Sequence, residues 1–227
     1  MRVVALNIET QANLDLLDQL ETPEVKLGRM TDPEKIRLKK EEAAKKAASS
    51  MALCPFYGKV LCISLATRKS ADQVKALTVF STDKPDGEKA IIEWLWKQLR
   101  TEPTKIVTFN GAGFDLPYLY LRGLQLGVDM PPAYELGKYQ VNTLGRIHVD
   151  LMQVLHQLYE SPTNVSQNLS FYGRMLLKID WPFPDVDQSH LGHLILQEGG
   201  RQIIQNLCEW NTKTALALFE LLSARLP

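Results

Sequence analysis

The order of short apolar runs and amphipathic stretches constrains the fold of this chain more than any other feature. Residues 58–69 and 73–82 are apolar, β-rich runs joined by a short polar connection, which predicts an antiparallel hairpin. An apolar run at 2–8 precedes the hairpin. Two more follow it, one at 105–110 and one that ends at Asp150. A helical pattern at 88–100 precedes the first of them, and another within 111–127 lies between them. This order predicts an α/β fold with a mixed sheet and helices on both faces.

The other segments are predicted to be helical. Residues 32–51 form a charged helix with Asp32 as N-cap and Pro33 at the first helical position. Its lysines are balanced by glutamates at helical spacing, so the pattern favours an exposed, ion-paired helix over a nucleic-acid contact. The C-terminal part shows helical stretches at 151–158, 166–179, 189–199 and 201–226. The length favours one domain over residues 1–227, with the loop at 161–166 as the sharpest internal break.

Charge and cysteine content narrow the class of protein. The chain has 26 basic and 26 acidic residues, so binding of nucleic acid requires a local basic patch. Three cysteines without paired short spacing argue against a disulfide framework or a zinc ribbon, and predict reduced, mostly buried thiols. No apolar stretch approaches membrane-spanning length, and the N-terminus lacks the pattern of a secretory signal. We expect a cytoplasmic protein that does not contact a membrane.

Two stretches contain the candidate chemistry. In "VVALNIET", Asn7 and Glu9 stand two residues apart on a predicted strand and therefore face the same side. In "TFNGAGFDLPYLYLRG", a strand ends at Asn110 and Asp115 follows at the start of a helix. This position is the C-terminal edge of the sheet, where sites in open α/β sheets collect. Taken alone, Asp115 is explained more simply as an acid that interacts with the helix dipole.

Together with "CEWNTKTALALF" near the C-terminus, these stretches resemble the three motifs of the 3′-5′ exonuclease domain of B-family DNA polymerases and of their stand-alone relatives. The resemblance covers nearly the whole chain and implies a ribonuclease H-like, mixed five-stranded sheet flanked by helices. The middle motif matches best, with these residues where the family has them: Phe109, Asn110, Gly111, Phe114, Asp115, Pro117 and Leu119.

In such exonucleases four acidic residues hold two divalent metal ions, and a tyrosine four residues before the last aspartate positions water. The resemblance implies Mg²⁺ or Mn²⁺ at Asn7, Glu9, Asp115 and Asn211, and it places Leu207 at the tyrosine. Asn7 and Asn211 thus stand where aspartate is expected, and Asn206 does not match the histidine of a related branch. Two-metal hydrolysis needs anionic ligands. Each lost carboxylate removes roughly 4 kcal/mol of attraction at about 4 Å. Leucine cannot orient water.

The resemblance also suggests which residues contact nucleic acid. The positions expected along the cleft are Thr10, Asn110, Gly111, Phe114 and Tyr118. Phe114, Tyr118 and Trp210 are candidate stacking surfaces, and Arg122 and Lys213 are candidate phosphate contacts, although aromatic residues at helical spacing also suit a core. Asp150 fits a helix N-cap better than a ligand. The histidine pair His190 and His193 fits packing better than metal binding.

Four interpretations stay open on the sequence. The favoured one is a degraded exonuclease with little or no activity that still binds single-stranded nucleic acid, expected to be DNA, or a replication or repair protein. A second is an active exonuclease that tolerates asparagine, for example with Mn²⁺. A third is an active enzyme whose two aspartates were deliberately replaced, against which Leu207 argues. The last is a non-catalytic scaffold in a replication or repair assembly.

Overall fold

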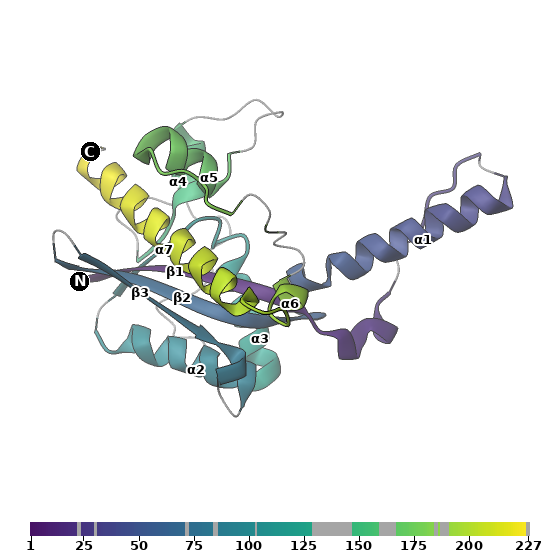
Figure 1. The fold of residues 1–227 in the computed structure, drawn as a ribbon, viewed down its shortest axis with the longest axis horizontal. Coiled ribbons are helices and arrows are strands. Elements are labelled where there is room, and N and C mark those ends of the chain that lie inside the picture. The colour runs from purple at the N-terminus through teal and green to yellow at the C-terminus, as the bar shows by residue number, and fades with distance from the viewer. Residues whose placement is uncertain are drawn as a thin grey trace.

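A computed structural model describes residues 1–21, 24–29, 31–70, 73–83, 86–102, 104–128, 147–158, 167–183, 186 and 191–225. Its centre is a five-stranded mixed sheet with strand order β3-β2-β1-β4-β5 (Figure 1). The strands are β1 (Arg2–Ala12), β2 (Gly58–Ser70), β3 (Gln73–Phe80), β4 (Thr104–Thr108) and β5 (His148–Asp150). The predicted α/β class with a mixed five-stranded sheet is confirmed.

The pairing of the strands follows the predicted order. β1 runs antiparallel to β2 and parallel to β4, β2 and β3 form the predicted hairpin, and β4 runs parallel to β5. The ladder between β1 and β2 shifts register at Glu9, which lies opposite Cys62, whereas Thr10 lies opposite Val60. The extra residue on β2 is Leu61. Such a bulge redirects side chains and is frequent next to functional sites.

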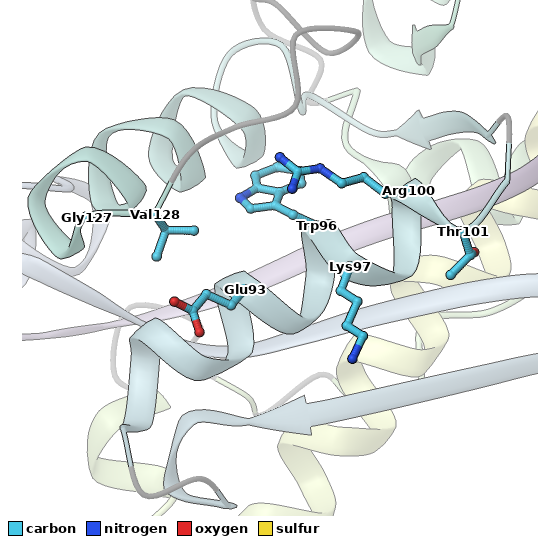
Figure 2. Close-up of a pocket in the computed structure, with 7 residues that line it drawn as sticks. All are labelled: Glu93, Trp96, Lys97, Arg100, Thr101, Gly127 and Val128. Atoms are coloured by element: carbon cyan, nitrogen blue, oxygen red, sulfur yellow. The ribbon is translucent and has the colours of Figure 1, made fainter.

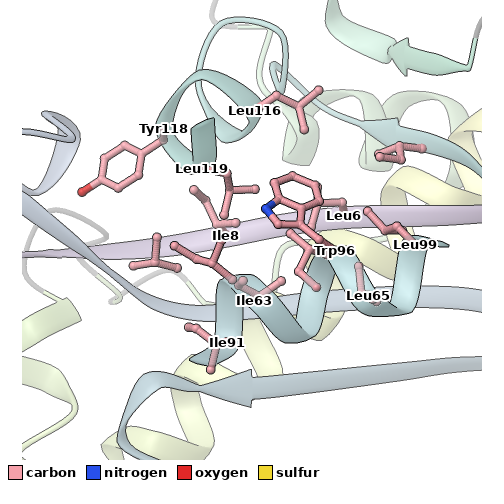
Figure 3. Close-up of a cluster of buried hydrophobic side chains, with 14 of the residues drawn as sticks. Leu6, Ile8, Ile63, Leu65, Ile91, Trp96, Leu99, Leu116, Tyr118 and Leu119 are labelled. Atoms are coloured by element: carbon pink, nitrogen blue, oxygen red, sulfur yellow. The ribbon is translucent and has the colours of Figure 1, made fainter. Parts of the chain in front are cut away.

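Helices cover both faces of the sheet. On one face α2 (Gly87–Arg100) and α3 (Asp115–Leu126) enclose an apolar core that includes Leu6, Ile8 and Trp96 (Figure 3). On the other face α4 (Leu151–Leu158) and α7 (Gly200–Arg225) pack on Ala5, Ala66 and Val107. Two predicted helices are shorter than expected. They are α5 (Leu169–Tyr172), which continues as a π-helical turn over Gly173–Leu177, and α6 (Leu191–Leu194).

The backbone hydrogen bonds explain why these two helices end early. After Leu194 the amides of Leu196 and Gln197 bond to carbonyls three residues back, so the α-helix tightens and stops. After α5 the amide of Ile179 instead reaches the carbonyl of Gly173, and Lys178 takes a left-handed conformation. The predicted loop at 161–166 lies outside the described residues.

The charged segment forms the predicted helix α1 (Pro33–Ser49), and Asp32 caps it by accepting hydrogen bonds from the amides of Glu34 and Lys35. None of its residues is buried, and in Figure 1 it extends away from the sheet as an arm. Two short 3₁₀ turns, η1 (Leu14–Gln19) and η2 (Met51–Leu53), stand before and after it, and η3 (Ser81–Asp83) follows β3. Of the helices that the structure describes, none has the length and apolar character needed to cross a membrane.

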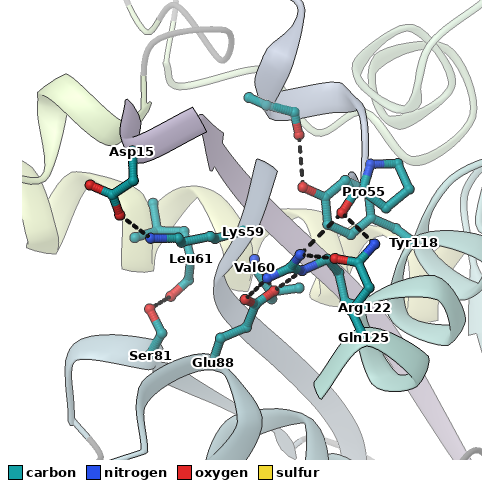
Figure 4. A network of polar contacts seen from close by, with 11 residues as sticks. Asp15, Pro55, Lys59, Val60, Leu61, Ser81, Glu88, Tyr118, Arg122 and Gln125 are labelled. Carbon is teal, nitrogen blue, oxygen red and sulfur yellow. Dashed lines mark hydrogen bonds and ion pairs between the residues drawn. The ribbon is translucent and has the colours of Figure 1, made fainter. Parts of the chain in front are cut away.

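A buried ion pair joins β2, α2 and α3 (Figure 4). Arg122 Nη2 lies 2.5 Å from Glu88 Oε2, Arg122 Nε donates to Glu88 Oε1 at 2.8 Å, and the same oxygen accepts the Val60 amide at 2.8 Å. Arg122 also donates to the Pro55 carbonyl and to the side chain of Gln125. Both charged side chains are 8% exposed. Because each charge is desolvated, the removal of one leaves the other unpaired inside the protein.

We therefore expect Glu88→Ala to lower the free energy of unfolding by roughly 3–5 kcal/mol, because Arg122 stays buried without its partner. The control is Glu41→Ala, which breaks the exposed i,i+4 pair with Arg37 and should cost no more than about 0.5 kcal/mol. Urea denaturation followed by circular dichroism measures both values. Equal losses in the two variants would contradict a structural role for the buried pair.

Candidate functional site at the edge of the sheet

The central strand β1 brings Asn7 and Glu9 under helix α7. Side chains alternate along a strand, so Leu6 and Ile8 enter the core below α2 and α3 while Asn7 and Glu9 face the other side. Asn7 Nδ2 donates a hydrogen bond to Glu9 Oε1 at 3.0 Å, and Asn211 Nδ2, from α7, donates to the same oxygen at 3.2 Å. The first and third predicted motifs therefore meet on one carboxylate.

Asp115 joins the second motif to the same strand. Its Oδ1 accepts the backbone amide of Ile8 at 3.0 Å, and the side chain is buried. The β1–β4 ladder ends at Ala5 opposite Val107, so the amide of Ile8 lies beyond it and takes the carboxylate as its partner. Asp115 thus has a structural role at the start of α3 in addition to any chemistry, and it lies close enough to Glu9 for the two carboxylates to affect each other.

The turn between β4 and α3 has a specific backbone conformation. Asn110 has a left-handed φ of 66°, and a Cβ on Gly111 would lie 2.3 Å from Thr108 Oγ1, so only glycine fits there. Asp150 accepts the amides of Asn110 and Ala112, each at 2.9 Å. Its Oδ1 also accepts the Met152 amide at 3.0 Å. The predicted N-cap role of Asp150 is confirmed, and the same side chain holds the turn that presents Asp115.

Burial dominates the electrostatics of the site. Desolvation raises the pKa of Glu9 from 4.5 to about 7, although the hydrogen bonds from Asn7 and Asn211 act in the opposite direction. Desolvation also raises the pKa of Asp115 from 3.8 to about 7, and the neighbouring Glu9 and Asp150 add to that rise. His148, which contacts Thr108 Oγ1 at 2.8 Å, has its pKa lowered to about 4, mainly by burial. Near neutral pH the two site carboxylates are therefore partly protonated.

Leu207, at the predicted tyrosine position, is fully buried. It belongs to an apolar cluster between β2 and α7 with these buried neighbours: Leu61, Cys62, Phe80, Leu191, Ile204 and Cys208. A side chain in this environment has no contact with solvent water. The apolar residue at 207 is therefore explained by its packing.

A row of small polar contacts beside Glu9 was not identified from the sequence. Cys62 Sγ and Cys208 Sγ are 3.2 Å apart, and Ser64 Oγ and Thr212 Oγ1 are 3.3 Å apart. Each contact joins β2 to α7. The expected burial of the thiols holds for Cys62 and Cys208, whereas Cys54 is only half-buried. The positions of these residues in the sequence do not predict the contacts, because the contacts depend on how α7 packs on the sheet.

The structure corrects two of the predicted nucleic-acid contacts. Tyr118 is 2% exposed in the α2–α3 core and donates its hydroxyl to the Ala52 carbonyl, so its ring has no free face for a base. Arg122 is occupied by Glu88. Lys213 is exposed but lies 2.9 Å from Glu209.

The other predicted contacts lie in different environments. Thr10 is buried, Asn110 and Phe114 are half-buried at the turn, and Gly111 is buried. The half-buried Trp210 packs edge-on against Trp181, with 4.8 Å between ring centroids. Within the described ranges no group of three His, Cys, Asp or Glu side chains is placed to hold a metal ion. His193 lies in α6, and His190 falls outside those ranges.

A pocket of about 580 Å³ lies away from these residues (Figure 2). It is lined by the second half of α2, including Trp96 and Arg100, and by Gly127 and Val128 after α3. Asp115 stands at the opposite end of α3. The pocket therefore contains none of the predicted site residues.

Comparisons with known proteins agree with the motif resemblance. Residues 53–176 match a family described as predicted 3′-5′ exonuclease related to the exonuclease domain of PolB. DNA polymerase 1 of Pyrococcus abyssi is 31% identical over 121 residues, which are 47% of this chain and 15% of that protein. The DNA polymerase of Thermococcus aggregans is 30% identical over 120 residues, which are 7% of its length. The match therefore spans a small part of these polymerases.

A solved structure extends the likeness of fold to nearly the whole chain. The family B DNA polymerase from the hyperthermophilic archaeon Pyrobaculum calidifontis aligns with a TM-score of 0.61 and 16% identity. The alignment covers 98% of this chain and 24% of the polymerase chain. At this identity the comparison shows the fold, and it agrees with the predicted ribonuclease H-like sheet.

The raised pKa values of Glu9 and Asp115 predict a pH effect on stability. Between about pH 4.5 and 7 the folded protein binds more protons at these groups than the unfolded chain, so their contribution to stability falls as the pH rises. His148 acts in the opposite sense over a similar range, because its pKa is lowered on folding. The test is therefore a comparison of the parent with the Glu9→Gln, Asp115→Asn variant in EDTA. We expect the variant to gain on the order of 5 kcal/mol relative to the parent between pH 5 and 8, because each of the two carboxylates contributes about half of this.

The control for this comparison is Glu93→Gln, which changes a carboxylate on α2 away from the site. Urea unfolding at each pH measures the free energies. Parallel pH profiles for the parent and the double variant would show that the two site carboxylates ionise normally.

Proposed function

The chain belongs to the family of predicted 3′-5′ exonucleases related to the exonuclease domain of PolB, and on that basis we propose that it is a nucleic-acid-binding, exonuclease-like domain with an impaired two-metal centre. Residues 1–227 act as a single domain in this proposal. Its ligand is single-stranded nucleic acid with a free 3′ end. The names of its relatives, which are DNA polymerases, favour DNA.

The observation that carries the proposal is the pair of amide groups on Glu9. Asn7 and Asn211 occupy two expected ligand positions, and both donate N–H groups to Glu9 Oε1. Two divalent cations held close together need several anionic oxygen ligands, and an amide oxygen can act as a ligand but adds no charge. If the two side-chain amides were flipped, each would direct its oxygen atom toward the site. That oxygen is neutral, and the flip would remove both hydrogen bonds to the Glu9 carboxylate. The residues present therefore do not fit a pair of divalent ions.

The two acidic residues that are retained add to this argument. Burial raises the pKa of both Glu9 and Asp115 to about 7, so a metal ion that bound here would have to displace protons from them. Leu207 lies in an apolar cluster and offers no polar atom to an attacking water. The site thus lacks two of the expected anionic ligands and a group that would orient the nucleophile, whereas Asp115 is still held against β1.

The direct test is nucleotide release from a 5′-labelled single-stranded DNA oligonucleotide in Mg²⁺ and in Mn²⁺. We expect no product ladder from the parent and a weak ladder from the Asn7→Asp, Asn211→Asp variant, because two carboxylates are returned to the site. Adding Asp115→Ala to this variant should abolish the ladder and so exclude a contaminating nuclease. A ladder from the parent that Asp115→Ala removes would overturn the proposal and show that two carboxylates are enough.

Thermal unfolding tests metal binding separately from catalysis. A ligand that binds only the folded state stabilises it by RT ln(1 + [L]/Kd), about 2.7 kcal/mol at a hundredfold excess over Kd. We expect 10 mM MgCl₂ to leave the Tm of the parent within about 1 °C of its value in EDTA. The Asn7→Asp, Asn211→Asp variant should instead be less stable in EDTA and gain several degrees with the metal. A clear Mg²⁺-dependent rise in the parent would count against an impaired centre.

A further inference from the structure

Three basic side chains near the predicted cleft already take part in ion pairs. Arg122 is paired with Glu88, Lys213 with Glu209, and Lys59, which lies opposite Gln11 on β1, with Asp15. Proteins that bind single strands combine stacking surfaces with a positive groove that follows the phosphates. Phe114, which packs on the ring of Tyr118, is a half-buried candidate for stacking, and these three cations are not free to meet the phosphates.

Helix α1 concentrates positive charge in a chain that is neutral as a whole. It contains six basic residues, Lys35, Arg37, Lys39, Lys40, Lys45 and Lys46, and three glutamates. Its net charge is therefore +3, and the rest of the chain has a net charge of −3. The compensating negative charge lies in residues 13–32, which lead into the helix and contain five acidic and two basic residues, so the chain outside residues 13–49 is neutral. The helix is therefore a local basic surface beside a neutral body, and such a surface attracts polyanions.

Most of this charge is not neutralised within the helix. Arg37 pairs with Glu41 at 2.7 Å, Lys35 lies 4.0 Å from Asp32, and Lys39 donates to the carbonyl of Lys26. In the part of the chain that the structure describes, Lys40, Lys45 and Lys46 form no ion pair and are exposed. The sequence pattern favours an ion-paired surface, and the structure shows one close i,i+4 pair in this helix.

The arm is attached beside the site. It connects the end of β1, three residues after Glu9, to the start of β2, and its base is held by the Asn13 amide on the Tyr57 carbonyl at 2.8 Å. After α1, Met51 and Ala52 are buried, and Tyr118 donates to the Ala52 carbonyl (Figure 4). The turn η2 also packs against β1, the strand that contains Glu9. The exposed helix therefore begins from a fixed base next to the candidate cleft.

We propose that α1 is a second nucleic-acid contact, which binds the phosphate backbone of a strand whose 3′ end lies in the cleft. This inference rests on the proposed function of the site. A helix of 17 residues is about 25 Å long, so the arm reaches several nucleotides beyond the cleft. The contact is electrostatic and independent of base sequence, because lysines on a helix surface meet phosphates rather than base edges.

The experiment measures the binding of two fluorescein-labelled single-stranded DNAs, 5 and 25 nucleotides long, by anisotropy in EDTA. The arm variant is Lys40→Gln, Lys45→Gln, Lys46→Gln. Glutamine keeps the helix propensity, which circular dichroism verifies. We expect this variant to bind the 25-mer at least tenfold more weakly than the parent at low salt, and to show a shallower salt dependence by up to about 2 in slope. Its affinity for the 5-mer should stay within twofold of the parent.

The matched control removes three exposed positive charges elsewhere, with Lys75→Gln, Lys97→Gln and Arg100→Gln. Lys75 lies opposite Thr67, at the end of the sheet remote from Glu9, and the other two lie on α2. This control should change the affinity for the 25-mer less than twofold. Equal losses in the arm and control variants, or no loss in either, would overturn the role of α1.

A cleft variant separates this inference from the proposed function. Phe114→Ala should weaken both oligonucleotides, because it removes a base contact in the cleft. If Phe114→Ala weakens binding and the arm variant does not, the proposed contact by α1 is rejected and the proposed function is retained. Failure of the parent to bind either oligonucleotide at any salt concentration rejects the function, and the arm contact with it.

Discussion

The alternation of side chains along β1 is the constraint on which the other parts of the structure depend. β1 is the middle strand of five, and both faces of it are covered. Its even-numbered residues Leu6 and Ile8 form the core below α2 and α3, so Asn7 and Glu9 must face α7. Because a shift of one residue would exchange the two sets, core packing and the position of the site are determined together.

The two asparagines suit a site that is stable without metal. Four carboxylates crowded at this edge would repel one another unless cations neutralised them. In this chain two neutral amides donate hydrogen bonds to Glu9, and burial keeps Glu9 and Asp115 partly protonated near neutral pH. The arrangement removes most of the repulsion that a metal would otherwise offset. Stability and catalysis often make opposite demands on active-site charges, and this arrangement supports the proposed impairment of the metal centre.

The distribution of positive charge separates the body from the arm. In the body, basic side chains near the site serve as structural partners, and the buried pair of Arg122 and Glu88 connects β2, α2 and α3. Helix α1 contributes nothing to the core, since none of its residues is buried. A segment that is free of packing constraints can carry surplus charge at little cost to folding. Helix α1 thereby presents exposed lysines although the chain has no net charge.

Much of the fold followed from local patterns. The hairpin of β2 and β3, the helices α1, α2 and α7, and the mixed sheet were all readable, because each depends on periodicity, caps and turns within short windows. The three motifs likewise identified the family, and Asp150 was readable as an N-cap.

The tertiary structure determined which side chains of these elements are buried and which meet at the site. Helical spacing leaves open whether Tyr118 and Arg122 face a cleft or the interior, and packing of α3 on β2 and α2 placed both inside. Asn211, which donates one of the two amide hydrogen bonds to Glu9, lies 202 positions from it in the sequence. The sequence by itself determined the elements, their order and the family. Only the packing of α3 and α7 on the sheet determined which side chains meet, because such long-range contacts leave no local pattern.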